Sequence, residues 1–64
     1  MCLATVYDQR ADAAHALLKD AQSLVVRQDQ LLFTDLLERE YEFRGQLLTA
    51  DFVNGQIIIK LAES

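Results

Sequence analysis

Cys2 is the only cysteine in a chain of 64 residues, and this limits how the chain can be stabilised. No internal disulfide can form, and one Cys with one His cannot supply the four ligands of a structural zinc. A chain this short buries only roughly 60% of the surface that its unfolded form exposes. Its 52% hydrophobic residues must therefore stabilise it through close packing or through self-association.

The same small size predicts one domain over residues 1–64, with no room for an extended catalytic cleft. Six Lys and Arg against ten Asp and Glu give a net charge of −4. This balance argues against nucleic acids and anionic membranes as partners, because both attract basic surfaces. The sequence has no apolar run of 18 residues and no signal-peptide pattern, so the expected compartment is the cytoplasm.

The second half of the chain is rich in strand signals. Residues 30–34 form a short apolar run, and residues 38–44 alternate charged with aromatic positions, as expected of a half-buried antiparallel strand. Gly45 predicts a bend or bulge before a further strand over 46–52. In that strand Leu48, Ala50 and Phe52 are expected to share a face.

Asn54 and Gly55 predict a tight hairpin, because both residues tolerate the positive φ of a type I′ turn. In the strand that follows, Ile57, Ile59 and Leu61 are expected to face the core, with Gln56 and Lys60 outside.

Nearer the amino terminus, residues 3–7 and 23–27 are also strand-like, and Gln28 and Asp29 predict a turn. The alanine-rich region over 8–22 favours helix on intrinsic propensity, with a short helical turn within 9–16. Five or six strands with short turns predict an all-β fold, a closed or nearly closed barrel.

Cys2 is the strongest candidate for chemistry. Removal of Met1 would leave a terminal cysteine whose α-amine and thiol can chelate a soft or borderline metal through a five-membered ring. The plainer alternative is a small apolar residue at the start of a strand. His15 is interpreted as a surface residue, and Glu38, Glu40 and Glu42 as a solvated face that guards a strand edge. No catalytic motif appears in the sequence.

Several segments together resemble the CooT family of small nickel-binding accessory proteins, which are connected with carbon monoxide dehydrogenase maturation. They are MCLATVY at residues 1–7, LFTDL at 32–36, Gly45, DFV at 51–53 and the hairpin to residues 57–60. The resemblance covers almost the whole chain, and the cysteine directly after Met1 is its most specific element.

The resemblance implies a small SH3-like or Sm-like barrel of five to seven short antiparallel strands, a homodimer, and Ni(II) bound at Cys2. It also implies a short strand over 16–19 and a nickel enzyme as client, without saying which enzyme. The first interpretation is therefore a metallochaperone-like protein and not an enzyme.

The ligand set stays open at this point. Cys2 from two subunits would give two nitrogens and two sulfurs around a twofold axis, which suits Ni(II) or Cu(II) but does not exclude Zn(II) or Cu(I). Alternatively, amides of Leu3 or Ala4 would complete the plane within one chain. Two other functions are weighed: a metal-free interaction module, and an N-terminal cysteine nucleophile, which would need an oxyanion hole that 64 residues hardly allow.

Overall fold

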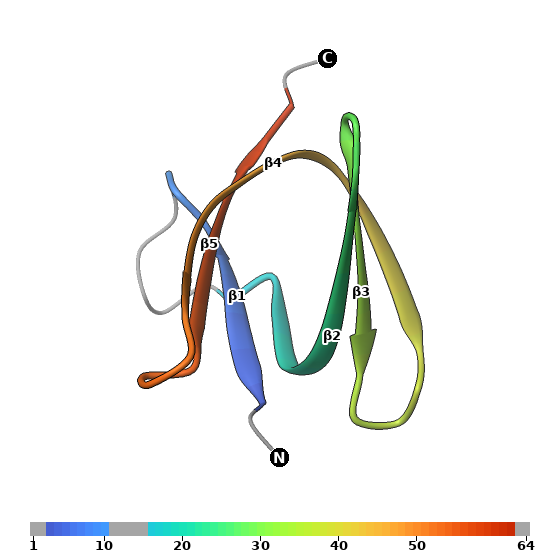
Figure 1. The fold of residues 1–64 in the computed structure, drawn as a ribbon, viewed down its shortest axis with the longest axis vertical. Helices are drawn as coiled ribbons and strands as arrows, with labels where there is room; N and C mark the ends of the chain where they lie inside the picture. Colours follow the sequence, from blue (N-terminus) through green and yellow to red (C-terminus); the bar gives the residue numbers. More distant parts are fainter. Residues whose placement is uncertain (1–2, 11–15, 63–64) are drawn as a thin grey trace.

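The structure is a computed structural model that describes residues 3–10 and 16–62, which form five strands and no helix. The strands are β1 (Ala4–Asp8), β2 (Leu18–Arg27), β3 (Gln30–Asp35), β4 (Glu40–Asp51) and β5 (Gln56–Leu61) (Figure 1). The predicted all-β fold is thus confirmed. No helix in the described part of the chain is long and apolar enough to cross a bilayer.

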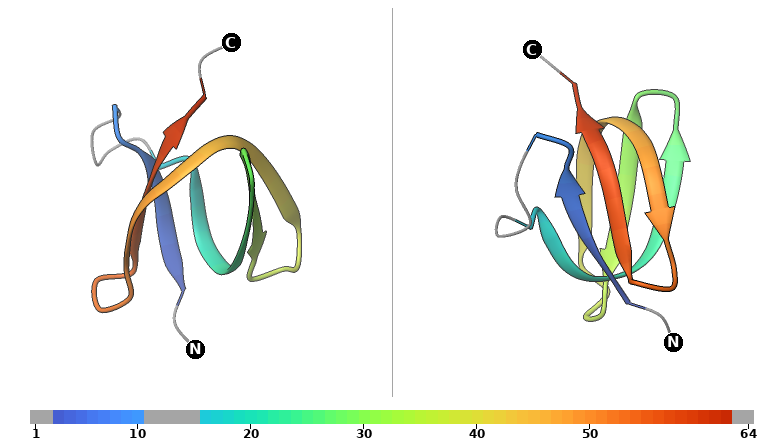
Figure 2. Two further views of the ribbon diagram at one scale, coloured as in Figure 1. Left: turned by 45° about the horizontal axis from the view of Figure 1, so that its top comes forward. Right: turned by 90° about the vertical axis from the view of Figure 1, so that its left-hand side faces the viewer.

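The five strands pair in chain order to form a closed barrel (Figure 2). Consecutive strands are antiparallel, whereas β1 and β5 close the barrel as a parallel pair, with Val6 opposite Ile57 and Asp8 opposite Ile59. The predicted small barrel of antiparallel strands is confirmed, and the structure adds two details to it. One of the five pairings is parallel, and β2 and β4 are 10 and 12 residues long because each takes part in two halves of the barrel.

Gly45 is where β4 passes from one half of the barrel to the other, as the sequence predicted. Before it, β4 pairs with β3; from it onward, β4 pairs with β5, and the strand arches over the barrel in Figure 1. The φ angle of Gly45 is 155°, and a Cβ placed there would overlap the carbonyl oxygen of Lys60. Its N–H donates to the carbonyl of Asp29 at 2.8 Å, so the bend is held on both sides.

The core follows from strand alternation, because every second residue of β1, β3 and β5 points inward. Phe33 is fully buried, and its ring meets that of Phe43 edge to face at a centroid distance of 5.8 Å. Ile57 and Ile59 are buried and Leu61 packs against the core, which confirms the predicted inward face of β5. The buried apolar set is Ala4, Val6, Leu18, Ala21, Leu31, Phe33, Ile57 and Ile59.

The predicted two-residue type I′ turn between β4 and β5 is wrong. The loop spans residues 52–55, and only Gly55 in it has a positive φ, of 67°. The Asp51 carboxylate shapes this loop by accepting hydrogen bonds from the N–H groups of Val53 and Asn54, both at 3.0 Å. The loop is thus stabilised by hydrogen bonds to the Asp51 side chain, and it does not need the two positive φ angles of a type I′ turn. Phe52 consequently lies in the loop, and the strand expected over 46–52 ends at Asp51.

The helical preference of the alanine-rich region is also overridden where the structure describes it. Residues 18–22 belong to β2, in which Leu18 is in register with Val6 and Ala21 with Ala4. Burial of Leu18 and Ala21 against β1 outweighs a helix propensity difference of a few tenths of a kcal/mol per residue. The strand implied over 16–19 begins at Leu18. A short helical turn was expected within residues 9–16. Residues 9–10 form a turn that is not helical, and residues 11–15 lie outside the described residues.

Candidate metal site at the amino-terminal end of the barrel

Cys2, the predicted metal ligand, lies outside the described residues, but the structure fixes the backbone next to it. The N–H of Thr5 donates to the carbonyl oxygen of Gly55 at 2.8 Å. The carbonyl oxygen of Leu3 lies 2.9 Å from the position that a Cβ on Gly55 would occupy. Only glycine permits this approach at a φ of 67°, so the β4–β5 loop holds the start of β1 in place.

An apolar cavity of about 250 Å³ opens beside this contact. Ala4 of β1 and Leu3, the residue before β1, line it, so the cavity lies beside the first residues that the structure describes. Most of the other lining side chains come from β2, β4 and the β4–β5 loop, among them Leu24, Leu47 and Phe52. We call this cavity the amino-terminal groove.

Exposed apolar side chains gather at the same end of the barrel. Figures 1 and 2 show the start of β1 between the β3–β4 loop and the β4–β5 loop. The β3–β4 loop exposes Leu36 and Leu37, at 48% and 69% of their surface, and the β4–β5 loop exposes Phe52 and Val53, at 71% and 94%. Exposed apolar side chains on two loops at one end of the barrel make this end a candidate interaction surface.

The β3–β4 loop is organised around Asp35, a carboxylate that is only 3% exposed. One oxygen accepts the backbone N–H groups of Leu37 and Arg39, both at 2.9 Å. The other accepts Arg39 Nε at 2.8 Å and the Tyr41 hydroxyl at 3.0 Å. Burial alone would raise the pKa of Asp35, but the hydrogen bonds from Arg39, Tyr41 and Leu37 together lower it below the ordinary value.

A pH dependence follows from this lowered pKa. A group with a pKa lower in the folded than in the unfolded state stabilises the fold above its unfolded pKa of about 3.9, and this stabilisation is lost as the pH falls. We expect the difference in urea midpoint between the parent and Asp35→Asn to be largest near neutral pH and to shrink between about pH 5 and pH 3. A difference that stays constant over this range would show that ionisation of Asp35 does not stabilise the loop.

The other sequence candidates do not come together in the described residues. Within residues 3–10 and 16–62, no three His, Cys, Asp or Glu side chains lie close enough to hold a metal ion. His15 lies outside these ranges. Glu40 and Glu42 are exposed on the part of β4 that is paired with β3, whereas Glu38 precedes the strand with a φ of 64°. The interpretation of all three as one strand face is therefore wrong for Glu38.

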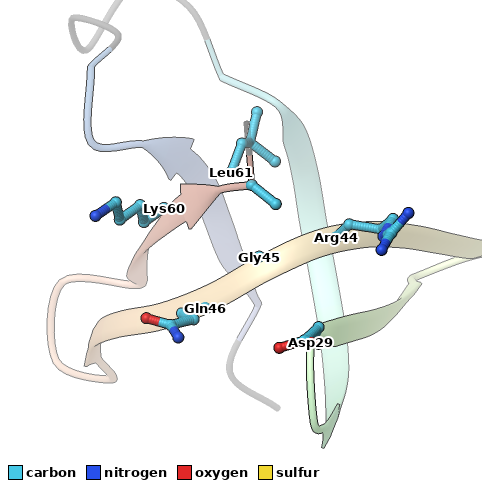
Figure 3. Close-up of a pocket in the computed structure, with 7 residues that line it drawn as sticks. Asp29, Arg44, Gly45, Gln46, Lys60 and Leu61 are labelled. Atoms are coloured by element: carbon cyan, nitrogen blue, oxygen red, sulfur yellow. The ribbon is translucent and has the colours of Figure 1, made fainter. Parts of the chain in front are cut away.

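A second cavity, of about 450 Å³, lies at Gly45, where β4 bends. Figure 3 shows Arg44 and Lys60 leaving the backbone in opposite directions at this place, so the two cations do not converge. Asp29 contributes the only carboxylate among the described lining residues. The arrangement therefore lacks the convergent polar groups of a ligand site, in contrast to the apolar groove at the amino terminus.

Comparison with known protein families decides the relationship. The family model described as CO dehydrogenase accessory protein CooT matches residues 1–60 of the 64-residue chain. The chain belongs to the CooT family. A search of curated proteins returned no match for the chain.

Membership in the CooT family makes this chain an accessory protein of CO dehydrogenase and not a catalyst. The alternative of an N-terminal cysteine nucleophile is therefore wrong. The match includes position 2, where the sequence resemblance was most specific, and the Asp35 position together with both exposed loops.

The hydrogen-bond network of Asp35 and the exposed pair Leu36 and Leu37 were not predicted from the sequence of this CooT-family chain. The sequence does contain a signal for this loop. Asp35 ends an apolar strand and can form a turn through its side chain, and two leucines follow it outside the strand. Its meaning depended on Arg39 and Tyr41 folding back onto Asp35, which alternation alone does not reveal.

Proposed function

We propose that this CooT protein binds Ni(II) as cargo through Cys2 and passes it to a nickel enzyme during maturation. The observation that supports this most is the match of the CO dehydrogenase accessory family over a region that includes Cys2. A terminal cysteine supplies an amine and a thiolate on adjacent carbons, a donor pair suited to square-planar Ni(II). The proposed metal residue is Cys2, and no other residue is assigned as a ligand.

The backbone of the described residues supports Leu3 over Ala4 as a source of a further donor in the proposed single-chain ligand set. Ala4 is in register with Ala21 of β2. Two residues further on, the carbonyl of Val6 accepts a hydrogen bond from the N–H of Leu17, so this side of β1 faces β2. Moving the backbone at Ala4 toward a metal would disturb this register. Leu3 precedes β1 and lies outside the register pairs of the described strands. Within one chain, the Leu3 amide is thus the better candidate for a third donor.

We propose further that two copies of the chain associate through the amino-terminal groove, so that two Cys2 chelates share one metal ion. An exposed Phe52 and a groove lined by Leu3, Leu24 and Leu47 form an apolar surface beside the proposed site. A twofold contact here would place the two amino termini near one axis. In this proposal the protein is a homodimer, and each subunit is one domain over residues 1–64. The proposed compartment is the cytoplasm, where a thiolate stays reduced.

A metal-free interaction module remains the second candidate function. The exposed apolar loops at the amino-terminal end favour it, since they would serve a protein partner whether or not a metal is bound. The two candidates differ at Cys2, because a module without a metal would tolerate serine there.

Native mass spectrometry of the untagged protein with and without NiCl₂ tests the proposal. We expect loss of Met1, a mass close to that of two chains, and one nickel ion per pair. One nickel per single chain would contradict the shared site, and no nickel in either state would leave the interaction module as the better function. Light scattering at micromolar concentration checks the subunit count independently.

Nickel binding should also depend on pH and on a free amino terminus. Binding displaces protons from the thiol and from the amine, with ordinary pKa values of about 8.5 and 7.7–8.0, so the apparent affinity is expected to rise from about pH 6 to pH 8. An N-terminal tag removes the five-membered chelate and should weaken binding or change the visible spectrum. If tagged and untagged proteins share one affinity, spectrum and pH profile, the amine is not a ligand.

A further inference from the structure

We propose that the β3–β4 loop docks the client enzyme, with Leu36 and Leu37 inserting into an apolar pocket on CO dehydrogenase that still lacks nickel. This inference rests on the proposed function for the identity of the partner, and it assigns a second surface that the metal site does not require. We call the pair Leu36 and Leu37 the leucine knob. Its two side chains are 48% and 69% exposed.

The conformation of the loop is fixed before any partner binds. Asp35 accepts four hydrogen bonds, two of them from the backbone N–H groups of Leu37 and Arg39 inside the loop. The N–H of Leu36 donates to the carbonyl of Asp20 at 3.0 Å, which attaches the loop to β2. The backbone at both leucines is therefore held in place by hydrogen bonds.

Backbone strain is concentrated at the same place. Among the described residues, Asp20 and Glu38 are the two non-glycine residues with positive φ, at 59° and 64°. Asp20 supplies the carbonyl that binds Leu36, and Glu38 lies directly after Leu37. Strain of this kind persists where the surrounding structure enforces it, and it is found most often at functional sites. The strained and hydrogen-bonded loop presents two apolar side chains to solvent, which is the arrangement of a preorganised contact.

The position and size of the knob favour the client enzyme over a second copy of the chain. The loop lies at the end of the barrel where β1 begins, so a partner bound to it would lie at the same end as the start of β1 (Figures 1 and 2). A stable dimer buries about 800 Å² per partner, far more than two half-exposed leucines supply. A transient encounter needs less, and a carrier must release its client after transfer.

The surroundings of the knob match the margin of a protein contact. A shallow pocket of about 190 Å³ beside the two leucines is lined by Lys19, Asp20 and Arg39, with the Arg39 side chain 64% exposed. An apolar centre with a polar rim of both charges is the usual composition of a specific interface. The partner surface should thus be an apolar pocket edged by polar groups.

Binding of the full-length protein to purified nickel-free CO dehydrogenase, measured by biolayer interferometry, tests the proposal. Leu36→Ser/Leu37→Ser should weaken binding at least about tenfold, because a buried leucine contributes enough for a factor of ten. The matched control is Val25→Thr/Val26→Thr, which changes two residues that are 45% and 56% exposed on β2 and should stay within about twofold of the parent. Asp35→Asn keeps both leucines and should weaken binding by a smaller factor.

Each variant is also examined by thermal unfolding, light scattering and nickel titration. The proposal expects a folded Leu36→Ser/Leu37→Ser protein with unchanged subunit count and nickel affinity. It is overturned if this variant binds the enzyme as the parent does, if the parent shows no binding, or if the variant loses self-association, which would make the knob a contact between copies. Asp35→Asn binding equal to the parent overturns the role given to Asp35. If the parent binds the enzyme but does not bind nickel, the proposed function is contradicted and the docking proposal is not.

Discussion

Replacing Cys2 with serine is expected to lower the affinity for nickel by orders of magnitude while leaving the circular dichroism spectrum unchanged. Serine keeps the size of the side chain but exchanges a soft thiolate for a hydroxyl, which is a poor ligand for Ni(II) at neutral pH. The fold should persist, because the core of the described residues is built from positions at and after Ala4. Isothermal titration with NiCl₂ measures the change.

His15→Gln is the matched control for this substitution, since it removes the only imidazole of the chain. We expect its nickel affinity to equal that of the parent. A Cys2→Ser protein that binds nickel as tightly as the parent would move the site elsewhere, and a weakened His15→Gln protein would identify the imidazole as a ligand.

Gly45→Ala is expected to lower the free energy of unfolding by about 2–4 kcal/mol. Alanine would adopt a strained φ there, and its Cβ would overlap the backbone of β5. The added Cβ would meet the carbonyl oxygen of Lys60, and this oxygen belongs to the β5 backbone and cannot move without breaking the pairing with β4. The whole stability of a 64-residue domain is on the order of 3–10 kcal/mol, so the loss is a large share of it. Thermal unfolding should show a melting temperature lower by roughly 10 °C or more.

The neighbouring substitution Gln46→Ala serves as the control, because Gln46 is the next residue of β4 and is exposed. Its effect should stay within about 0.5 kcal/mol. Equal melting temperatures for Gly45→Ala and Gln46→Ala would mean that β4 bends without requiring a glycine.

The strands that could be predicted are those whose local pattern agrees with their environment in the barrel. Charged and aromatic residues alternate from Glu40 to Arg44, and this alternation survives because one face of that part of β4 covers the core while the other meets solvent. The inward positions Ile57 and Ile59 followed from the same rule. Gly45 could be identified as a bend because a glycine between two strand patterns has few other reasons to be there.

The candidate site divides in the same way. Cys2 was found from the sequence, since its chemistry depends on its place after Met1, and it remains a proposal. The amino-terminal groove could not be found, because Leu3 and Phe52 are distant in sequence and meet only through the approach of Leu3 to Gly55.

By itself, the sequence determined the all-β class, the bend at Gly45, the inward face of β5 and the family relationship. Each of these depends on short patterns or on residue identity at single positions. The tertiary structure decided the rest: β2 extends back to Leu18, β1 closes on β5 in parallel, and Asp35 gathers Arg39 and Tyr41 around it. These features arise from pairings between segments far apart in the chain, and the burial energy of such pairings exceeds the local preferences that a single sequence displays.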